Sequence, residues 1–205
     1  MHIDFLVEEQ SMEIVLENIV PKIIGTSSNI TFQIHDFRGR DRLLGKLQDR
    51  MRGYAAIMKD QHDLRVVVLI DEDREDCQKL KAKLEAVATD VGLMTRSKSA
   101  GSRFKVLNRI VVEELEAWFF GDLTAIREAY PYISPDLLKK KAYRDPDAIP
   151  GGTWESLERE LCRGRKKLGK GAIARAISPY MQPERNCSKS FQVFRDGLLE
   201  LIKFG

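Results

Sequence analysis

The sequence predicts an α/β fold in which helices flank a mainly parallel four-stranded sheet. Four short apolar segments occur within residues 1–124, and each is followed by apolar residues at helical spacing. The third segment, residues 64–70, is an almost uninterrupted run of Val, Leu and Ile, which is typical of a strand buried on both faces. Strands that alternate with helices predict parallel pairing through right-handed crossovers.

Residues 2–7 form the first expected strand, and a helix follows it. We expect Ser11 to be the N-cap of this helix and Pro21 to kink or shorten it. Residues 30–35 alternate apolar and polar side chains, which is typical of a strand with one exposed face. The apolar residues of the helix recur every three or four positions: Met12, Val15, Leu16, Ile19, Val20 and Ile23.

A polar loop over residues 35–42 precedes the second expected helix, which extends to Met58. The buried strand 64–70 comes next, and a third helix is expected from Glu75 to about Val91. Residues 104–112 form the fourth expected strand. Residues 113–122 are acidic at first and then continue as a helix in which Trp118, Phe119 and Phe120 are expected to be core residues.

The remainder of the chain is rich in Pro and Gly, which divide it into short elements. We expect helices over residues 154–163, 171–177 and 190–204, with Ser188 and Ser190 capping the last one. The sequence therefore predicts two units. The first is an α/β domain at 1–124, and the second is a helical C-terminal extension at 125–205 that packs on it.

The composition indicates a soluble, cytoplasmic protein. The net charge is only +3, and three widely spaced cysteines give neither a disulfide framework nor a zinc pattern. No N-terminal signal pattern is visible, and no apolar run approaches the length of a membrane span. We therefore expect no membrane partner.

Acidic residues follow three of the four expected strands: Glu8 and Glu9, then Asp71, Asp73 and Asp76, then Glu113, Glu114 and Glu116. Parallel strands bring their carboxyl ends to one edge, where sites form in such sheets. Two like charges about 4 Å apart repel by roughly 4 kcal/mol, and a divalent cation reverses this effect. Oxygen ligands favour Mg²⁺ or Mn²⁺. The alternative is a set of solvated acids at helix starts, which remains open for Glu13 and which we expect for Asp76. Glu113 and Glu114 are expected to face solvent beside Glu116.

Several segments together resemble the Toprim domain of primases, topoisomerases and OLD-family nucleases. They are FLVEEQSMEIVLENIVPKI, VVVLIDEDREDC, EELEAWFFGD, the region around Gly169 and Lys170, and residues 188–191. Over nearly the whole chain they look like a bacterial Toprim-like family known only as a domain of unknown function. The resemblance implies a Rossmann-like Toprim fold.

The resemblance also implies roles for single residues. Glu8 would be the general acid or base, and Asp71 and Asp73 would hold the metal. The candidates for a second metal and for phosphate contact are Glu13, Glu116 and Lys170. The chain departs from the family pattern where Glu9 replaces the usual Gly, so either Glu8 or Glu9 could face the site.

We expect a Mg²⁺- or Mn²⁺-dependent phosphodiester hydrolase that cleaves DNA or RNA. By analogy with OLD-family nucleases it would be the effector of a defence system with an ATPase partner, because no GxxxxGK[ST] motif occurs here. The alternative is a non-catalytic regulatory subunit that binds nucleic acid. A homo-oligomer is left open.

A late basic run is the expected contact for the phosphate backbone. Its members are Arg163, Arg165, Lys166, Lys167 and Arg175. This run is the densest positive patch of the sequence, and we expect no acids near it. A merely solvated helix face is the other interpretation of this run.

Overall fold

The computed structural model describes residues 1–25, 29–72 and 76–203. Its centre is a four-stranded sheet with the order β2-β1-β3-β4, and every neighbouring pair is parallel. The predicted α/β class with a parallel sheet is confirmed. The strands are β1 (His2–Val7), β2 (Thr31–Asp36), β3 (Leu64–Asp71) and β4 (Val106–Val111).

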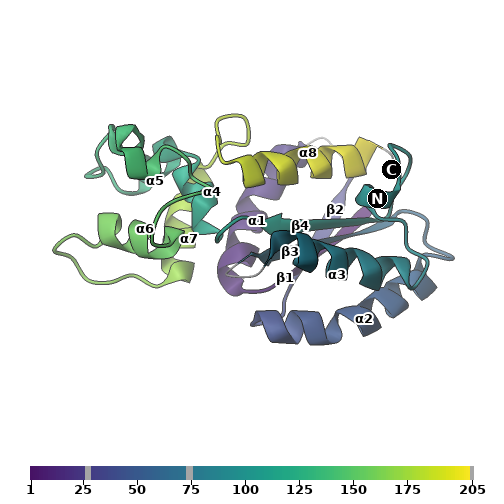
Figure 1. Cartoon of the computed structure of the whole chain (residues 1–205). Coiled ribbons are helices and arrows are strands. Elements are labelled where there is room, and N and C mark those ends of the chain that lie inside the picture. Colours follow the sequence, from purple (N-terminus) through teal and green to yellow (C-terminus); the bar gives the residue numbers. More distant parts are fainter. Residues whose placement is uncertain (26–28, 73–75, 204–205) are drawn as a thin grey trace.

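Two helices cover each face of the sheet (Figure 1). On one face lie α1 (Gln10–Ile24) and α8 (Lys189–Lys203), and on the other lie α2 (Arg40–Ile57) and α3 (Cys77–Thr89). β3 serves both cores because its side chains alternate between the two faces. Val67 and Leu69 belong to the α1/α8 core, whereas Val66, Val68 and Ile70 belong to the α2/α3 core.

The strand order places a switch point between β1 and β3. The chain leaves β1 toward β2 on one side, and β3 then leads to β4 on the other side. Val7 pairs with Leu69, so the residues after Val7 lie beside the end of β3. Ligands of open parallel sheets bind outside the carboxyl ends of the strands at such a point. The fold therefore brings the acids that follow β1 and β3 together.

The helical segments after β4 lie beyond the carboxyl ends of the strands, at the left of Figure 1. They are α4 (Glu116–Phe120), α5 (Leu123–Ala129), α6 (Thr153–Leu161) and α7 (Lys170–Ile177). Short 3₁₀ helices complete the described chain: η1 (Arg96–Lys98), η2 (Leu137–Lys139), η3 (Lys141–Tyr143) and η4 (Ser178–Tyr180). α8 then returns along the sheet, and its apolar residues join the core around α1.

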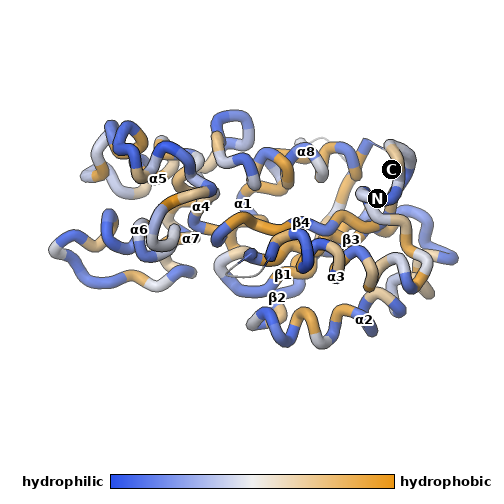
Figure 2. Tube along the Cα trace, in the orientation of Figure 1, coloured by the Kyte–Doolittle hydropathy of each residue, from blue (hydrophilic) through white to orange (hydrophobic). Residues whose placement is uncertain are grey.

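The predicted aromatic core after β4 is confirmed. Trp118, Phe119 and Phe120 are fully buried, and the Trp118 indole nitrogen donates a hydrogen bond to Ser190 Oγ at 3.0 Å. Figure 2 shows hydrophobic colouring along the strands and α4, and mostly hydrophilic colouring in the outer loop at the left. α4 therefore fastens the helical region to α8.

The helix starts differ in part from the sequence expectations. The N-cap of α1 is Glu9 rather than Ser11, whose hydroxyl lies inside the helix and donates to the Glu9 carboxylate. The helix also continues through Pro21 and ends at Ile24. The predicted cap by Ser188 is confirmed, because its hydroxyl accepts from the Phe191 N–H at 3.2 Å.

The expected helix-start role of Asp76 is also confirmed. Its carboxylate accepts hydrogen bonds from the N–H groups of Gln78 and Lys79, at 2.9 and 3.2 Å, and so caps α3. Across the described part of the chain, no helix is both long and apolar enough to cross a membrane.

Candidate acidic site at the sheet edge

Asp71 is the last residue of β3 and lies at the switch point. Only 2% of the residue is exposed, and its Oδ1 atom has no hydrogen-bond partner among the described residues. Burial raises the pKa of Asp71 well above its usual value, and the charges of Glu8, Glu116 and Glu9 raise it further. The protein therefore holds a buried carboxyl group that packing alone does not explain.

Glu116 begins α4 and supplies a second buried carboxyl group. It is 1% exposed, and its Oε2 atom has no hydrogen bond in the described structure. Burial raises the pKa of Glu116 to about 7, although Lys170 opposes this shift. Near neutral pH this group exchanges a proton readily, or ionises fully when a cation binds beside it.

Lys170, at the start of α7, places its ammonium group among three carboxylates. Nζ lies 3.5 Å from Glu114 Oε1, 3.7 Å from Glu116 Oε2 and 3.9 Å from Glu9 Oε1. Burial acts to lower the pKa of Lys170, but the surrounding acids outweigh this effect and raise it above its usual value. Lys170 is therefore a permanent cation in the site.

Glu114 ties the helical region to the sheet edge. We expected Glu113 and Glu114 to face solvent, and for Glu114 this expectation is wrong. Its Oε2 atom accepts from Thr153 Oγ1 at 3.1 Å and from the N–H of Trp154 at 2.9 Å. Because both donors belong to the first turn of α6, the same carboxylate fixes α6 and contacts Lys170.

Glu113 and Glu72 link the ends of β4 and β3. Glu113 has a φ of 60°, in the left-handed region that L-residues rarely adopt. Its N–H donates to Glu72 Oε2 at 3.2 Å, while the Glu72 N–H donates to the carbonyl of Val111 at 2.8 Å. Glu72 therefore braces β4. The left-handed conformation of Glu113 turns the chain from the end of β4 toward Glu114 and Glu116.

Both acids that follow β1 face the site. Glu8 is the acid whose charge most raises the pKa of Asp71, and Glu9 is the one that contacts Lys170. The backbone carbonyl of Glu8 accepts from the Gly39 N–H at 2.7 Å, which fixes the loop after β2 against this strand end. Glu9 thus adds a second carboxylate at this strand end.

An open cleft of about 670 Å³ leads from solvent to Glu9 and Lys170. Glu13 lies on its wall, where burial and the charges of Glu17 and Asp36 raise the pKa of Glu13. No direct contact joins Glu13 to Asp71 or Glu116 in the described structure, so Glu13 lines the entrance. The lining residues are Glu9, Gln10, Ser11, Glu13, Asp36, Arg38, Lys170 and Gly171.

The carboxyl groups at this edge are oxygen donors of the kind that a hard divalent cation takes. Asp71 Oδ1 and Glu116 Oε2 accept no hydrogen bond in the described structure, although Lys170 Nζ lies 3.7 Å from the Glu116 oxygen. Carboxylate oxygens are the ligands that Mg²⁺ and Mn²⁺ prefer. Within residues 1–25, 29–72 and 76–203, no group of three or more His, Cys, Asp or Glu side chains is arranged to hold a metal ion. Asp73, the other predicted ligand after β3, lies outside the described residues.

Residues 7–199 match a protein family described as Domain of unknown function (DUF4276). The chain belongs to the DUF4276 family. The comparisons with curated proteins and with solved structures found no match to this chain. The family assignment covers the strand-end acids, Lys170 and most of α8, so the whole candidate site lies inside the DUF4276 domain.

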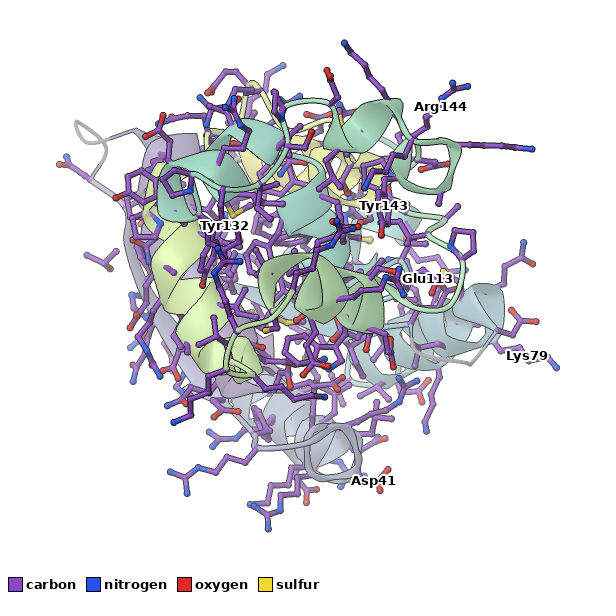
Figure 3. All side chains as sticks on the ribbon, turned by 90° about the vertical axis from the view of Figure 1, so that its left-hand side faces the viewer. Asp41, Lys79, Glu113, Tyr132, Tyr143 and Arg144 are labelled. Carbon is purple, nitrogen blue, oxygen red and sulfur yellow. The ribbon has the colours of Figure 1, made fainter. Side chains whose placement is uncertain are left out.

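The basic run of this DUF4276 domain is partly neutralised by neighbouring acids. Arg163 pairs with Glu160 at 2.8 Å, and Lys167 pairs with Glu158 at 3.1 Å. The guanidinium of Arg165 lies 3.7 Å from the centre of the Tyr132 ring, which Figure 3 labels. We expected no acids near this run, and that expectation is wrong. Lys166 and Arg175 are exposed, and contact of the run with nucleic acid stays a prediction.

Other residues of the site were missed in the sequence. Arg40, at the start of α2, donates to the backbone carbonyl of Asp71 at 2.9 Å and so fixes the end of β3. Asp36, the last residue of β2, and Arg38, in the loop after it, line the cleft. The sequence does contain one signal for this loop. Basic residues recur at every fourth position from Arg38 onward.

Proposed function

We propose that this DUF4276 protein is a metal-dependent phosphodiester hydrolase that cleaves DNA or RNA with Mg²⁺ or Mn²⁺. The observation that carries the proposal is the pair Asp71 and Glu116. Both are almost fully buried, both have raised pKa values, and each has a carboxylate oxygen without a hydrogen bond. Buried carboxyl groups with strongly perturbed pKa values cluster at functional sites.

Asp71 and Glu116 would hold the metal, together with Asp73. A divalent cation bound there would neutralise phosphate oxygens and lower the pKa of a bound water. Glu8, whose charge acts on Asp71, would serve as general base toward that water. Lys170 stays protonated at neutral pH and would pair with a phosphate oxygen that enters through the cleft.

The proposal extends to a Toprim-like ancestry, a cytoplasmic location and an ATPase partner. Its support is the likeness of the sequence segments to Toprim proteins and the position of the acids after β1, β3 and β4. The chain contains no GxxxxGK[ST] motif, so ATP hydrolysis in a defence complex would belong to the partner chain.

A second candidate is a regulatory subunit that binds nucleic acid without cleaving it. The observation that favours it is that no metal-binding set of three acids occurs in the described ranges. In addition, the ammonium group of Lys170 already offsets part of the negative charge. In this second candidate function, the ammonium group of Lys170 would take the place of the divalent metal ion rather than act beside it.

The deciding experiment compares the wild type with Asp71→Asn and with Asp90→Asn as the matched control. Asp90 is exposed at the end of α3, so the control carries the same chemical change away from the site. We expect the wild type and Asp90→Asn to bind Mn²⁺ by calorimetry and to cleave DNA or RNA, and Asp71→Asn to do neither. A wild type that binds no divalent cation would leave the regulatory subunit as the function.

A further inference from the structure

We infer that a row of exposed cations on α2 and the loop before it binds the phosphate backbone of a nucleic acid and leads that strand to the acidic site. We call this row the α2 stripe. The inference rests on the proposed function, since it names the surface that would hold the substrate of that site. The α2 stripe consists of Arg38, Arg42, Lys46 and Arg50.

The fold fixes the direction of the α2 stripe. Its members follow one another at intervals of four residues, so those within the helix share one face and are separated by a rise of about 6 Å each. The next row round α2, about 100° from the stripe, carries Leu43, Leu47 and Met51, which are buried in the core against the sheet. Burial of that row therefore turns the stripe toward solvent, where all four cations are exposed.

The α2 stripe lacks neutralising ion pairs within the described structure, although the charge of Arg38 acts to lower the pKa of Glu13. No ion pair joins any of its four members to a carboxylate there, while the nearby Asp49 pairs with Arg52 at 3.1 Å. The carboxylate of Asp36 accepts a backbone hydrogen bond from the Arg38 N–H at 2.7 Å. Figure 3 shows long nitrogen-tipped side chains that extend outward beside Asp41 at the start of α2. Positive charge is therefore available to an external partner.

Two features fix the ends of the stripe. The guanidinium of Arg50 lies 5.7 Å from the centre of the Phe37 ring, a distance at which a cation is attracted to an aromatic face. Arg38 has a φ of 55°, and the next residue, Gly39, donates its N–H to the carbonyl of Glu8. The loop thus holds Arg38 in an uncommon backbone conformation beside the acids that follow β1.

The α2 stripe is continuous with the candidate site. A groove of about 420 Å³ contains all four cations, together with His35, Asp36 and Phe37. Asp36 and Arg38 also line the cleft of about 670 Å³ that reaches Glu9 and Lys170. A polyanion bound along the stripe would therefore extend into the cleft. A small anion would not need a surface that is continuous with the cleft.

The experiment measures binding of a short DNA duplex and of its single strand in the presence of EDTA, so that cleavage is not required. The test variant is R42Q/K46Q/R50Q, in which Gln keeps side-chain length and helix propensity. The matched control is K59Q/K98Q/K203Q, which removes the same charge from exposed positions. Lys59 follows the end of α2, and Lys203 is the last residue of α8. Both helices end at the side of the molecule opposite the carboxyl ends of the strands (Figure 1).

We expect the test variant to reduce the slope of log K against log salt by about 2 to 3, because each lost phosphate contact removes roughly 0.7 to 0.9 from that slope. Its affinity at low salt should fall by at least about tenfold, whereas the control should keep the wild-type slope. Circular dichroism should show the same melting temperature for the two variants, since the substituted side chains are exposed.

An unaltered slope in R42Q/K46Q/R50Q, equal losses in the test and control variants, or a wild type that binds anionic vesicles but not DNA would each overturn the inference. Failure of the proposed function gives a different result. In that case the wild type binds DNA through the stripe, with the slope change above, but cleaves neither DNA nor RNA when Mn²⁺ is added.

Discussion

The ammonium nitrogen of Lys170 lies 3.7 Å from Oε2 of Glu116, a buried carboxylate oxygen that has no hydrogen bond in the described structure. The same ammonium group also contacts Glu114 and Glu9, and its charge acts on Asp71 as well. One ammonium group thus balances part of the negative charge of several acids. The remaining negative charge is the physical basis of the proposed metal site.

Replacement of Lys170 by Met should destabilise the metal-free protein. The change leaves the buried Glu116 without its cation, and a loss of about 1 to 3 kcal/mol in the free energy of unfolding is expected. Urea denaturation measures this loss. Lys166→Met is the control, because Lys166 is exposed and should change stability by no more than about 0.5 kcal/mol. Equal effects of the two substitutions would show that Lys170 does not balance the acids.

The stability of the metal-free protein should fall as the pH rises from about 4.5 to about 7. The folded state holds the Glu116 proton up to a pKa of about 7, whereas the unfolded chain releases it near 4.5. The folded state therefore binds more protons in this window, and the free energy of unfolding decreases with pH, by up to about 3 kcal/mol. Denaturation at several pH values measures this decrease.

Glu116→Gln provides the comparison for this pH dependence. The amide does not ionise, so the variant should lose less stability across the same window than the wild type. Mn²⁺ should restore stability to the wild type at neutral pH, since a bound cation favours the ionised carboxylate. Parallel curves for the wild type and Glu116→Gln would contradict the assignment of the raised pKa to Glu116.

Asp71→Asn should make the metal-free protein more stable at neutral pH while it abolishes Mn²⁺ binding. Neutralising this carboxyl group removes its repulsion with Glu8 and Glu116 inside a buried environment. We expect a gain of about 1 to 2 kcal/mol in thermal or chemical denaturation without metal. A loss of stability would instead assign Asp71 a structural role.

Glu114→Ala should loosen the attachment of α6 to the sheet edge. The substitution removes the acceptor of the Thr153 hydroxyl and of the Trp154 N–H, at a cost of about 1 to 2 kcal/mol. Hydrogen exchange should become faster in α6 than in α2. Glu184→Ala, at an exposed position, is the control and should leave the exchange rates of both helices unchanged.

Local patterns in the sequence were sufficient to predict the sheet. The apolar run that ends at Asp71 was predicted to be a doubly buried strand, and its side chains do pack into two cores. The predicted helices match α2, α6, α7 and α8 within a few residues at each end. Ser11 was misjudged because its hydroxyl bonds to a carboxylate rather than to a helix N–H.

The candidate site was only partly predictable for a physical reason. A strand-end acid such as Glu8 or Asp71 is placed by its own strand, and the parallel order of the sheet then brings the strand ends together. The contacts of Glu114 with α6, and the turn of Glu113 that allows them, depend on packing between segments distant in the chain. The α2 stripe has a sequence signal, but its exposure depends on which face of α2 is buried.

The sequence by itself determined the α/β class, the parallel sheet and the acidic residues at its edge, because these follow from side-chain periodicity and strand order. Only the tertiary structure decided which charges meet. It placed Lys170 among the acids, and it left oxygens of Asp71 and Glu116 buried without hydrogen bonds. It also paired two members of the late basic run, Arg163 and Lys167, with Glu160 and Glu158. Charge pairing depends on distances and burial across the whole fold, and these are fixed only when the helices pack.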